Sequence, residues 1–144
     1  MRKLLFLPVL MLLLLCPSCD VYMSDNGDLD GFWQLAQIDT IDGGVCDMVP
    51  RRIFWSVQTD LLQVSDLNYQ HDEYIFRFEH KADALRLYDP YLVDHAGSDE
   101  AVGDAESLRM YGINALDESF FVERIDKKQM RLRSQSLRLY FNRY

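Results

Sequence analysis

The sequence predicts an all-β domain, an antiparallel up-and-down barrel of eight strands, over residues 31–144. Short segments in which apolar and polar residues alternate follow one another along this part of the chain, and turn residues separate them. Strands joined in sequence order form an antiparallel meander, which at this length closes most simply as a barrel. A β-sandwich is the alternative that the same pattern leaves open. The expected strands are residues 31–39, 51–58, 60–67, 73–80, 84–92, 118–126, 129–134 and 136–144.

Residues 1–18 have the features of a lipoprotein signal peptide. Two basic residues precede an apolar run, residues 4–15, which is about 18 Å long as a helix and therefore too short to span a bilayer. The following "LCPSC", residues 15–19, resembles the bacterial lipoprotein box, in which the chain is cut before the cysteine and the sulfur receives a diacylglycerol. The resemblance implies lipidation of Cys19.

Residues 19–30 are expected to form an acidic tether between the lipid and the barrel. The stretch after the cysteine, "DVYMSDNGDLD", is polar and acidic. Acidic residues in this position also resemble the surface-export signal of Bacteroidetes lipoproteins. These features predict a location in the bacterial cell envelope, lipid-anchored to the outer membrane on its periplasmic or its surface-exposed face. The contact with the membrane is then made by acyl chains.

The strands are supported by their own alternation. In residues 31–39, Trp33, Leu35 and Gln37 share one face and Ile38 lies on the other. In residues 73–80, alternate aromatic side chains share a face in the same way. Parity predicts an inward-facing set: Trp33, Leu35, Tyr74, Phe76, Phe78, Leu85, Leu87, Met130, Leu132, Leu139 and Phe141.

Three connections differ from tight turns. Residues 39–50 form a loop marked by a Gly-Gly pair and a proline. Residues 94–107 are polar and form a long loop, which is uncommon inside a compact domain and points to function or mobility. Residues 107–113, "SLRMYGI", are expected to form a short helical turn.

The charge of the chain excludes nucleic acid as a partner. The chain has 15 basic and 23 acidic residues, a formal net charge of −8, and loss of the signal peptide removes two basic residues and makes it −10. An acidic domain has no electrostatic attraction for the phosphate backbone.

Cysteine and histidine usage predicts no metal and no cofactor. Loss of Cys16 and lipidation of Cys19 leave Cys46 as the only thiol, so no intrachain disulfide is expected. Cys46 and the three scattered histidines do not have the spacing of a zinc site. Residues 26–37 begin like a calcium loop, but Gln37 stands where that loop needs a glutamate.

Gly31-Phe32-Trp33 resembles the G-x-W motif that opens the first strand of lipocalins. In that family the tryptophan closes the barrel floor and a basic residue of the last strand packs across it, so the resemblance implies a floor made of Gly31, Trp33 and Arg143. In a closed meander the last strand pairs with the first, which brings Arg143 near Trp33. The segments "YGI", "FFVERID" and "QMRLRSQSLRLYFNRY" are also similar to the small lipocalin-like lipoproteins of Bacteroidetes.

This resemblance implies a non-enzymatic binding domain, and two forms of it remain open. In the first, the barrel holds a small hydrophobic ligand, because a barrel of this size can enclose one. In the second, the barrel is filled with side chains, and the domain is an interaction or scaffold module for an envelope protein. The predicted pocket residues are Leu35, Tyr74, Phe76, Phe78, Leu87, Met130, Leu139 and Phe141.

Enzymatic activity is not expected. The candidate carboxylates form pairs that are adjacent in sequence, at residues 72–73, 99–100 and 117–118. Adjacent residues on a strand point to opposite faces, whereas paired catalysis needs both groups on one substrate. No residue is therefore assigned a catalytic role.

Overall fold

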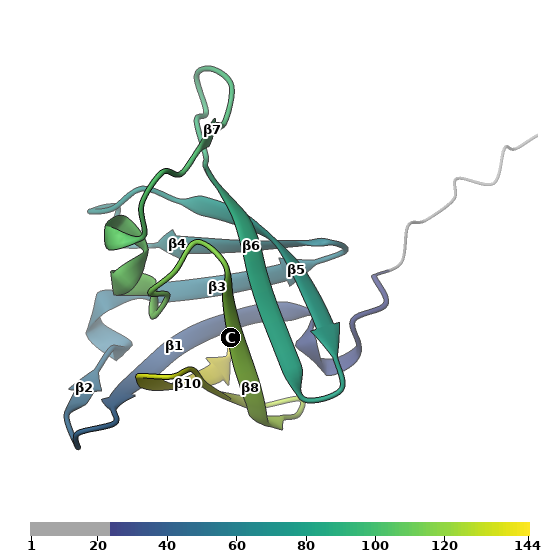
Figure 1. Cartoon of the computed structure of the whole chain (residues 1–144), viewed down its shortest axis with the longest axis vertical. Helices are drawn as coiled ribbons and strands as arrows, with labels where there is room; N and C mark the ends of the chain where they lie inside the picture. Colours follow the sequence, from purple (N-terminus) through teal and green to yellow (C-terminus); the bar gives the residue numbers. More distant parts are fainter. Residues whose placement is uncertain (1–23) are drawn as a thin grey trace, which may run out of the picture.

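The computed structural model describes residues 24–144, which form a closed antiparallel β-barrel (Figure 1). The strands are β1 (Gly31–Thr40), β2 (Val45–Asp47), β3 (Ile53–Gln58), β4 (Leu61–Asp66), β5 (Tyr74–Lys81), β6 (Ala84–Leu92), β7 (Glu100–Ala101), β8 (Glu118–Ile125), β9 (Gln129–Arg133) and β10 (Leu137–Arg143). Three short 3-10 helices accompany them: η1 (Gly27–Leu29), η2 (Val49–Arg51) and η3 (Glu106–Tyr111). No helix among the described residues is both long and apolar enough to cross a membrane.

The strand pairing confirms the predicted meander. Each barrel strand pairs antiparallel with its neighbour in the order β1, β3, β4, β5, β6, β8, β9, β10, and β10 pairs back onto β1. This last pairing closes the sheet into one eight-stranded barrel and excludes the two-sheet sandwich. The short strands β2 and β7 are additions that pair with β1 and β6, inside the segments expected to be loops.

Bulges change the side-chain alternation that the sequence predicts. The register shifts between Leu35 and Gln37 in β1, and similar shifts occur in β5 and β8. A bulge adds one residue to a strand and therefore exchanges the faces beyond it. The predicted faces of Gln37 and Ile38 are accordingly wrong: Ile38 packs against the core, and the amide of Gln37 donates to Asp39.

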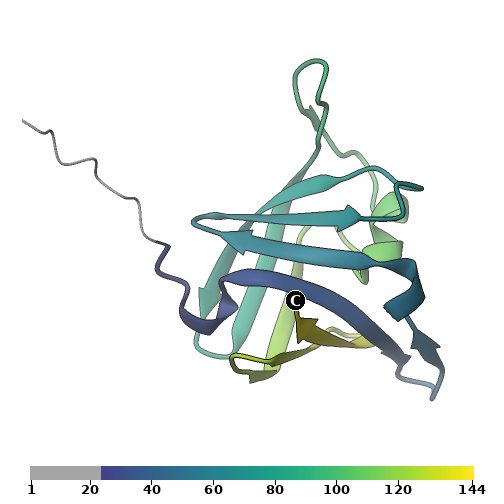
Figure 2. The ribbon, with the colours of Figure 1, turned by 180° about the vertical axis from the view of Figure 1, so that it is seen from behind.

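Large apolar side chains fill the interior of the barrel. All the residues expected to face inward belong to one core cluster, with Phe78 as a partly buried member. The cluster also includes Trp55, Phe120 and residues of η1 and η3. Figures 1 and 2 show η1 and η3 at opposite ends of the barrel, which we call the floor and the mouth.

The domain begins earlier than the boundary predicted at Gly31. Leu29 of η1 is fully buried, and the side chain of Asn26 donates to the carbonyl oxygen of Thr59 over 2.6 Å. The carboxylate of Asp30 accepts hydrogen bonds from Ser24 and Asn26. Residues 24–30, expected to be part of the tether, therefore pack on the floor. The predicted signal peptide and the lipidation site at Cys19 lie outside the described residues.

Candidate functional site

The floor of the barrel is built around Trp33. This side chain is fully buried, and its indole N–H donates to the carbonyl oxygen of Leu29 over 2.9 Å. The guanidinium carbon of Arg143 lies 4.3 Å from the centre of the Trp33 ring. Its two terminal nitrogens donate to the backbone oxygens of Asp30 and Asp28 over 2.7 and 2.6 Å. One side chain of the last strand thus ties β1 and η1 together.

Gly31 is required by this arrangement. Its φ of +136° lies in a region that side chains other than glycine rarely adopt, and a Cβ atom at this position would collide with the guanidinium of Arg143. The structure therefore brings together Gly31, Trp33 and Arg143, the three residues that the sequence predicts for the floor.

The predicted pocket residues lie in the filled interior and do not surround an open space. Seven of them are at most 6% exposed, and Phe78 is partly buried. Trp55 belongs to the same core cluster, and its ring lies 4.8 Å from that of Phe141 and 5.8 Å from that of Phe120. Trp55 is not among the residues predicted to face inward, although the alternation of Ile53, Trp55 and Val57 in β3 indicates that it does.

The mouth of the barrel is closed by η3 and the residues that follow it. Leu108, Tyr111 and Ile113 are fully buried. The indole N–H of Trp55 donates to the carbonyl oxygen of Tyr111 over 3.1 Å, and the Tyr111 hydroxyl donates to the carbonyl oxygen of Asp72 over 2.5 Å. The helical turn expected at residues 107–113 is therefore present, and it acts as a plug.

Gly112 sets the path of the chain where the plug ends. Its φ is +82°, the left-handed conformation typical of the residue after a helix. A Cβ atom at this position would press against the side chain of Leu139. The close approach of this backbone to β10 keeps η3 seated in the mouth.

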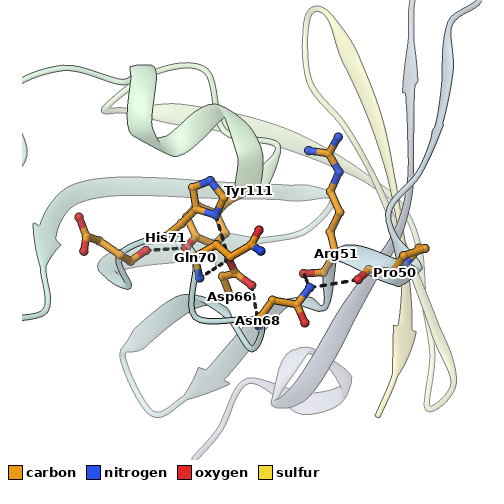
Figure 3. Close-up of polar contacts among 8 residues, drawn as sticks. Pro50, Arg51, Asp66, Asn68, Gln70, His71 and Tyr111 are labelled. Carbon is orange, nitrogen blue, oxygen red and sulfur yellow. Dashed lines mark hydrogen bonds and ion pairs between the residues drawn. The ribbon is translucent and has the colours of Figure 1, made fainter.

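A buried carboxylate, Asp66, organises the rim beside the plug (Figure 3). Its side chain is 2% exposed and accepts hydrogen bonds from the backbone N–H groups of Asn68 and Gln70 over 2.7 and 3.1 Å. It also lies 2.8 Å from Nδ1 of His71. Burial alone would raise the pKa of Asp66, but the hydrogen bonds from His71, Asn68 and Gln70 outweigh burial and lower it.

The same turn connects the other elements of the mouth. The side chain of Asn68 donates to the carbonyl oxygens of Pro50 and Arg51 in η2, over 3.1 Å each (Figure 3). After the turn, the carbonyl oxygen of Asp72 accepts the hydrogen bond from the Tyr111 hydroxyl, and burial raises the pKa of that hydroxyl. Asp66 and His71 contact each other, and Asp66 also contacts backbone groups, so this network links the β4–β5 turn to the rest of the rim.

The carboxylate pairs considered for catalysis do not converge on one site. Glu73 accepts a hydrogen bond from the side chain of Gln63, whereas Asp117 is paired with Arg86 on the outer face. The hydrogen bond from Arg86 lowers the pKa of Asp117, and burial raises the pKa of the neighbouring Glu118. Among residues 24–144, no three His, Cys, Asp or Glu side chains are grouped so that they could hold a metal ion.

Comparisons with known proteins agree with this architecture. The sequence profile of a family described as "Lipocalin-like domain" matches residues 11–144. A lipocalin-like protein from Bacteroides uniformis superposes with a TM-score of 0.62 at 21% identity, over 82% of this chain and 100% of its own. An uncharacterized protein from Bacteroides eggerthii superposes with a TM-score of 0.57 at 19% identity, over 80% and 98%. A search of curated proteins finds no match.

Proposed function

Because the chain belongs to the lipocalin-like domain family, we propose that it is an envelope-anchored, non-enzymatic lipoprotein that binds a partner protein through the rim of its mouth. The observation that carries this proposal is the filled barrel. Its interior residues are buried against one another, and η3 occupies the mouth. Trp55 and Phe76 are fully buried in this interior, so a ligand would enter only if such side chains moved. Truncating a buried aromatic side chain costs about 3–5 kcal/mol, which measures how strongly such packing is held.

The rim offers an exposed apolar surface instead. Ile41, Val45 and Val49, in the connection between β1 and β3, are 73%, 69% and 46% exposed, and Tyr69 of the neighbouring turn is 84% exposed. We call these four residues the apolar rim. Exposed apolar and tyrosine side chains are typical of the centres of protein interfaces.

A lipid at Cys19 would hold the barrel by its floor. The described chain begins at Ser24, which contacts the floor through Thr59 and Asp30. The five residues from Cys19 to Met23, which precede Ser24, can span at most about 18 Å at ~3.5 Å per residue. An anchor at this end leaves the apolar rim, at the opposite end, directed away from the membrane.

The anchor is tested by fractionating cells that express the full chain. The wild type should partition with membranes and a Cys19→Ala variant with the soluble fraction. A variant that stays in the membrane fraction would overturn the predicted lipidation.

The partner is tested with a photo-cross-linking amino acid placed at single positions in cells. A cross-linker at Val45 on the apolar rim should give a discrete adduct, which mass spectrometry then identifies. The matched control is Asp60, an exposed residue of the β3–β4 turn at the floor. The same adducts from both positions would argue against a specific rim interface.

A small apolar ligand inside the barrel is the second candidate, and the plug itself favours it. The plug is a single 3-10 segment of six residues between the long loop and Gly112, and its removal would uncover Trp55, Tyr74 and Leu139. A thermal-shift screen with fatty acids, sterols and haem separates the two candidates. The filled barrel predicts no saturable rise in Tm, whereas a ligand that opens the plug would raise it.

A further inference from the structure

The outer face of the barrel carries a hollow of about 460 Å³ near the mouth, between the end of β1 and the β9–β10 hairpin. Its charged walls are Arg133, Arg138 and Asp39, and its apolar walls are Ile41 and Leu137. The backbone N–H of Ile41 donates to the carbonyl oxygen of Ser136 over 3.2 Å, so the two sides of the hollow are joined. None of the residues that line the hollow belongs to η3.

Positive charge is concentrated beside this hollow in an otherwise acidic chain. Arg133 and Arg138 are directly opposite each other in the β9–β10 register. Like charges in that position repel. One carboxylate, Glu123, lies between them, at 3.6 Å from Nε of Arg133 and 2.9 Å from Nε of Arg138. It also lies 3.2 Å from Nε of Arg131.

One carboxylate cannot neutralise three guanidinium groups. Arg138 donates to Glu123 through Nε over 2.9 Å. Arg133 lies farther from the same carboxylate, with its Nε at 3.6 Å, and among the described residues the buried Nε of Arg131 has no hydrogen-bond partner. Asp39 pairs with Arg138 across the β1–β10 register, but its carboxylate accepts from the side chain of Gln37 over 2.6 Å. Arginine guanidinium groups therefore remain available at the hollow.

We propose that this hollow binds an anionic amphiphile, a molecule with a phosphate, sulfate or carboxylate group joined to an apolar chain. The planar guanidinium groups of Arg133 and Arg138 match the oxygens of such an anion, and their charge is offset when it binds. Ile41 is 73% exposed on the same hollow, and Leu137 is partly buried beside it, which supplies the apolar contact. This site stands whether or not the barrel interior binds a ligand.

The test uses the soluble chain from residue 20 to residue 144, which contains every described element. Octyl phosphate is titrated by calorimetry and by ¹H–¹⁵N spectra that include the arginine Nε–H groups. Inorganic phosphate serves as the free anion, and octyl glucoside as the neutral amphiphile. Saturable binding of octyl phosphate, tighter than that of inorganic phosphate and absent for octyl glucoside, supports the site. Equal binding of octyl phosphate and either control overturns it.

Variants locate the binding site. Arg133→Gln and Arg138→Gln should each weaken the binding of octyl phosphate about tenfold, the cost of one lost charge-assisted hydrogen bond. Arg77→Gln makes the same change in charge on β5, outside the hollow, and should leave the affinity unchanged. A loss of equal size in the Arg77 variant would show that the effect is net charge alone, and would overturn the site.

A variant that is expected to bind more tightly keeps the proposal testable even if the arginine variants unfold. Asp39→Asn removes the carboxylate that lines the hollow and should strengthen the binding of octyl phosphate about threefold. Native dispersion in the spectra shows that each variant is folded. If the arginine variants unfold, an unchanged or weaker affinity in Asp39→Asn overturns the proposal, and a stronger one supports it.

Discussion

Replacing Arg143 by alanine tests whether the floor holds the barrel closed. The substitution removes the two hydrogen bonds to Asp30 and Asp28 and the contact with the Trp33 ring. Hydrogen bonds from a charged group contribute about 1.5–3 kcal/mol each. Partial exposure at this site reduces the contribution of each of the two hydrogen bonds to roughly 1 kcal/mol. The contact with the indole ring adds about 1 kcal/mol. The free energy of unfolding should therefore fall by about 3 kcal/mol, a large part of the ~5–15 kcal/mol of a typical domain.

Urea denaturation of residues 20–144 measures this loss, with tryptophan fluorescence and circular dichroism as independent probes. Arg143→Lys keeps the charge but loses the fork of donors, so it should cost about half as much. Arg77→Ala is the matched control, because this arginine is exposed on β5. A loss below about 0.5 kcal/mol in Arg143→Ala, equal to that of the control, would refute the reasoning.

Three further predictions concern the floor and the mouth. Gly31→Ala should lower the free energy of unfolding by about 1–3 kcal/mol in the same urea assay, because of its φ and the collision with Arg143; an unchanged midpoint would contradict this. Asp66→Asn should cost about 1–3 kcal/mol at neutral pH. The pKa of Asp66 is lowered in the folded protein, so its stabilisation is present above about pH 4 and lost as the pH falls through the folded pKa; the difference between the wild type and Asp66→Asn should therefore shrink in acid, and a constant difference would count against the network. Tyr111→Phe removes the hydrogen bond to Asp72 and should cost about 1 kcal/mol; hydrogen exchange at the Trp55 indole should accelerate about fivefold, and unchanged exchange would show that the hydroxyl does not hold the plug.

Much of the barrel could be predicted because apolar and polar residues alternate within its strands. The alternation in residues 73–80 and 136–144 identifies strands and faces from near neighbours alone. The pairing of the last strand with the first follows from closing a meander, and it predicts that Arg143 lies beside Trp33, as the β1–β10 register confirms. The alternation failed in β1 at Gln37 because a bulge there is set by pairing with other strands and has no signature in the strand itself.

The mouth could not be predicted, because its contacts join segments far apart in the chain. Residues 107–113 read only as a helical turn, yet Tyr111 accepts a hydrogen bond from Trp55, 56 positions earlier. The predicted pocket residues were identified as inward-facing, but periodicity says nothing of how much space remains between them. Trp55 and the plug occupy that space.

By itself, the sequence determined that this chain is an acidic lipocalin-like barrel with a floor of Gly31, Trp33 and Arg143, since each of these conclusions depends on local alternation, composition or a short motif. Only the tertiary structure decided that the barrel is filled and plugged, and that Glu123 is shared by three arginines on the outer face. Those features depend on contacts between strands that are far apart in the sequence. Their energies depend on distance and burial, which exist only after the barrel has closed.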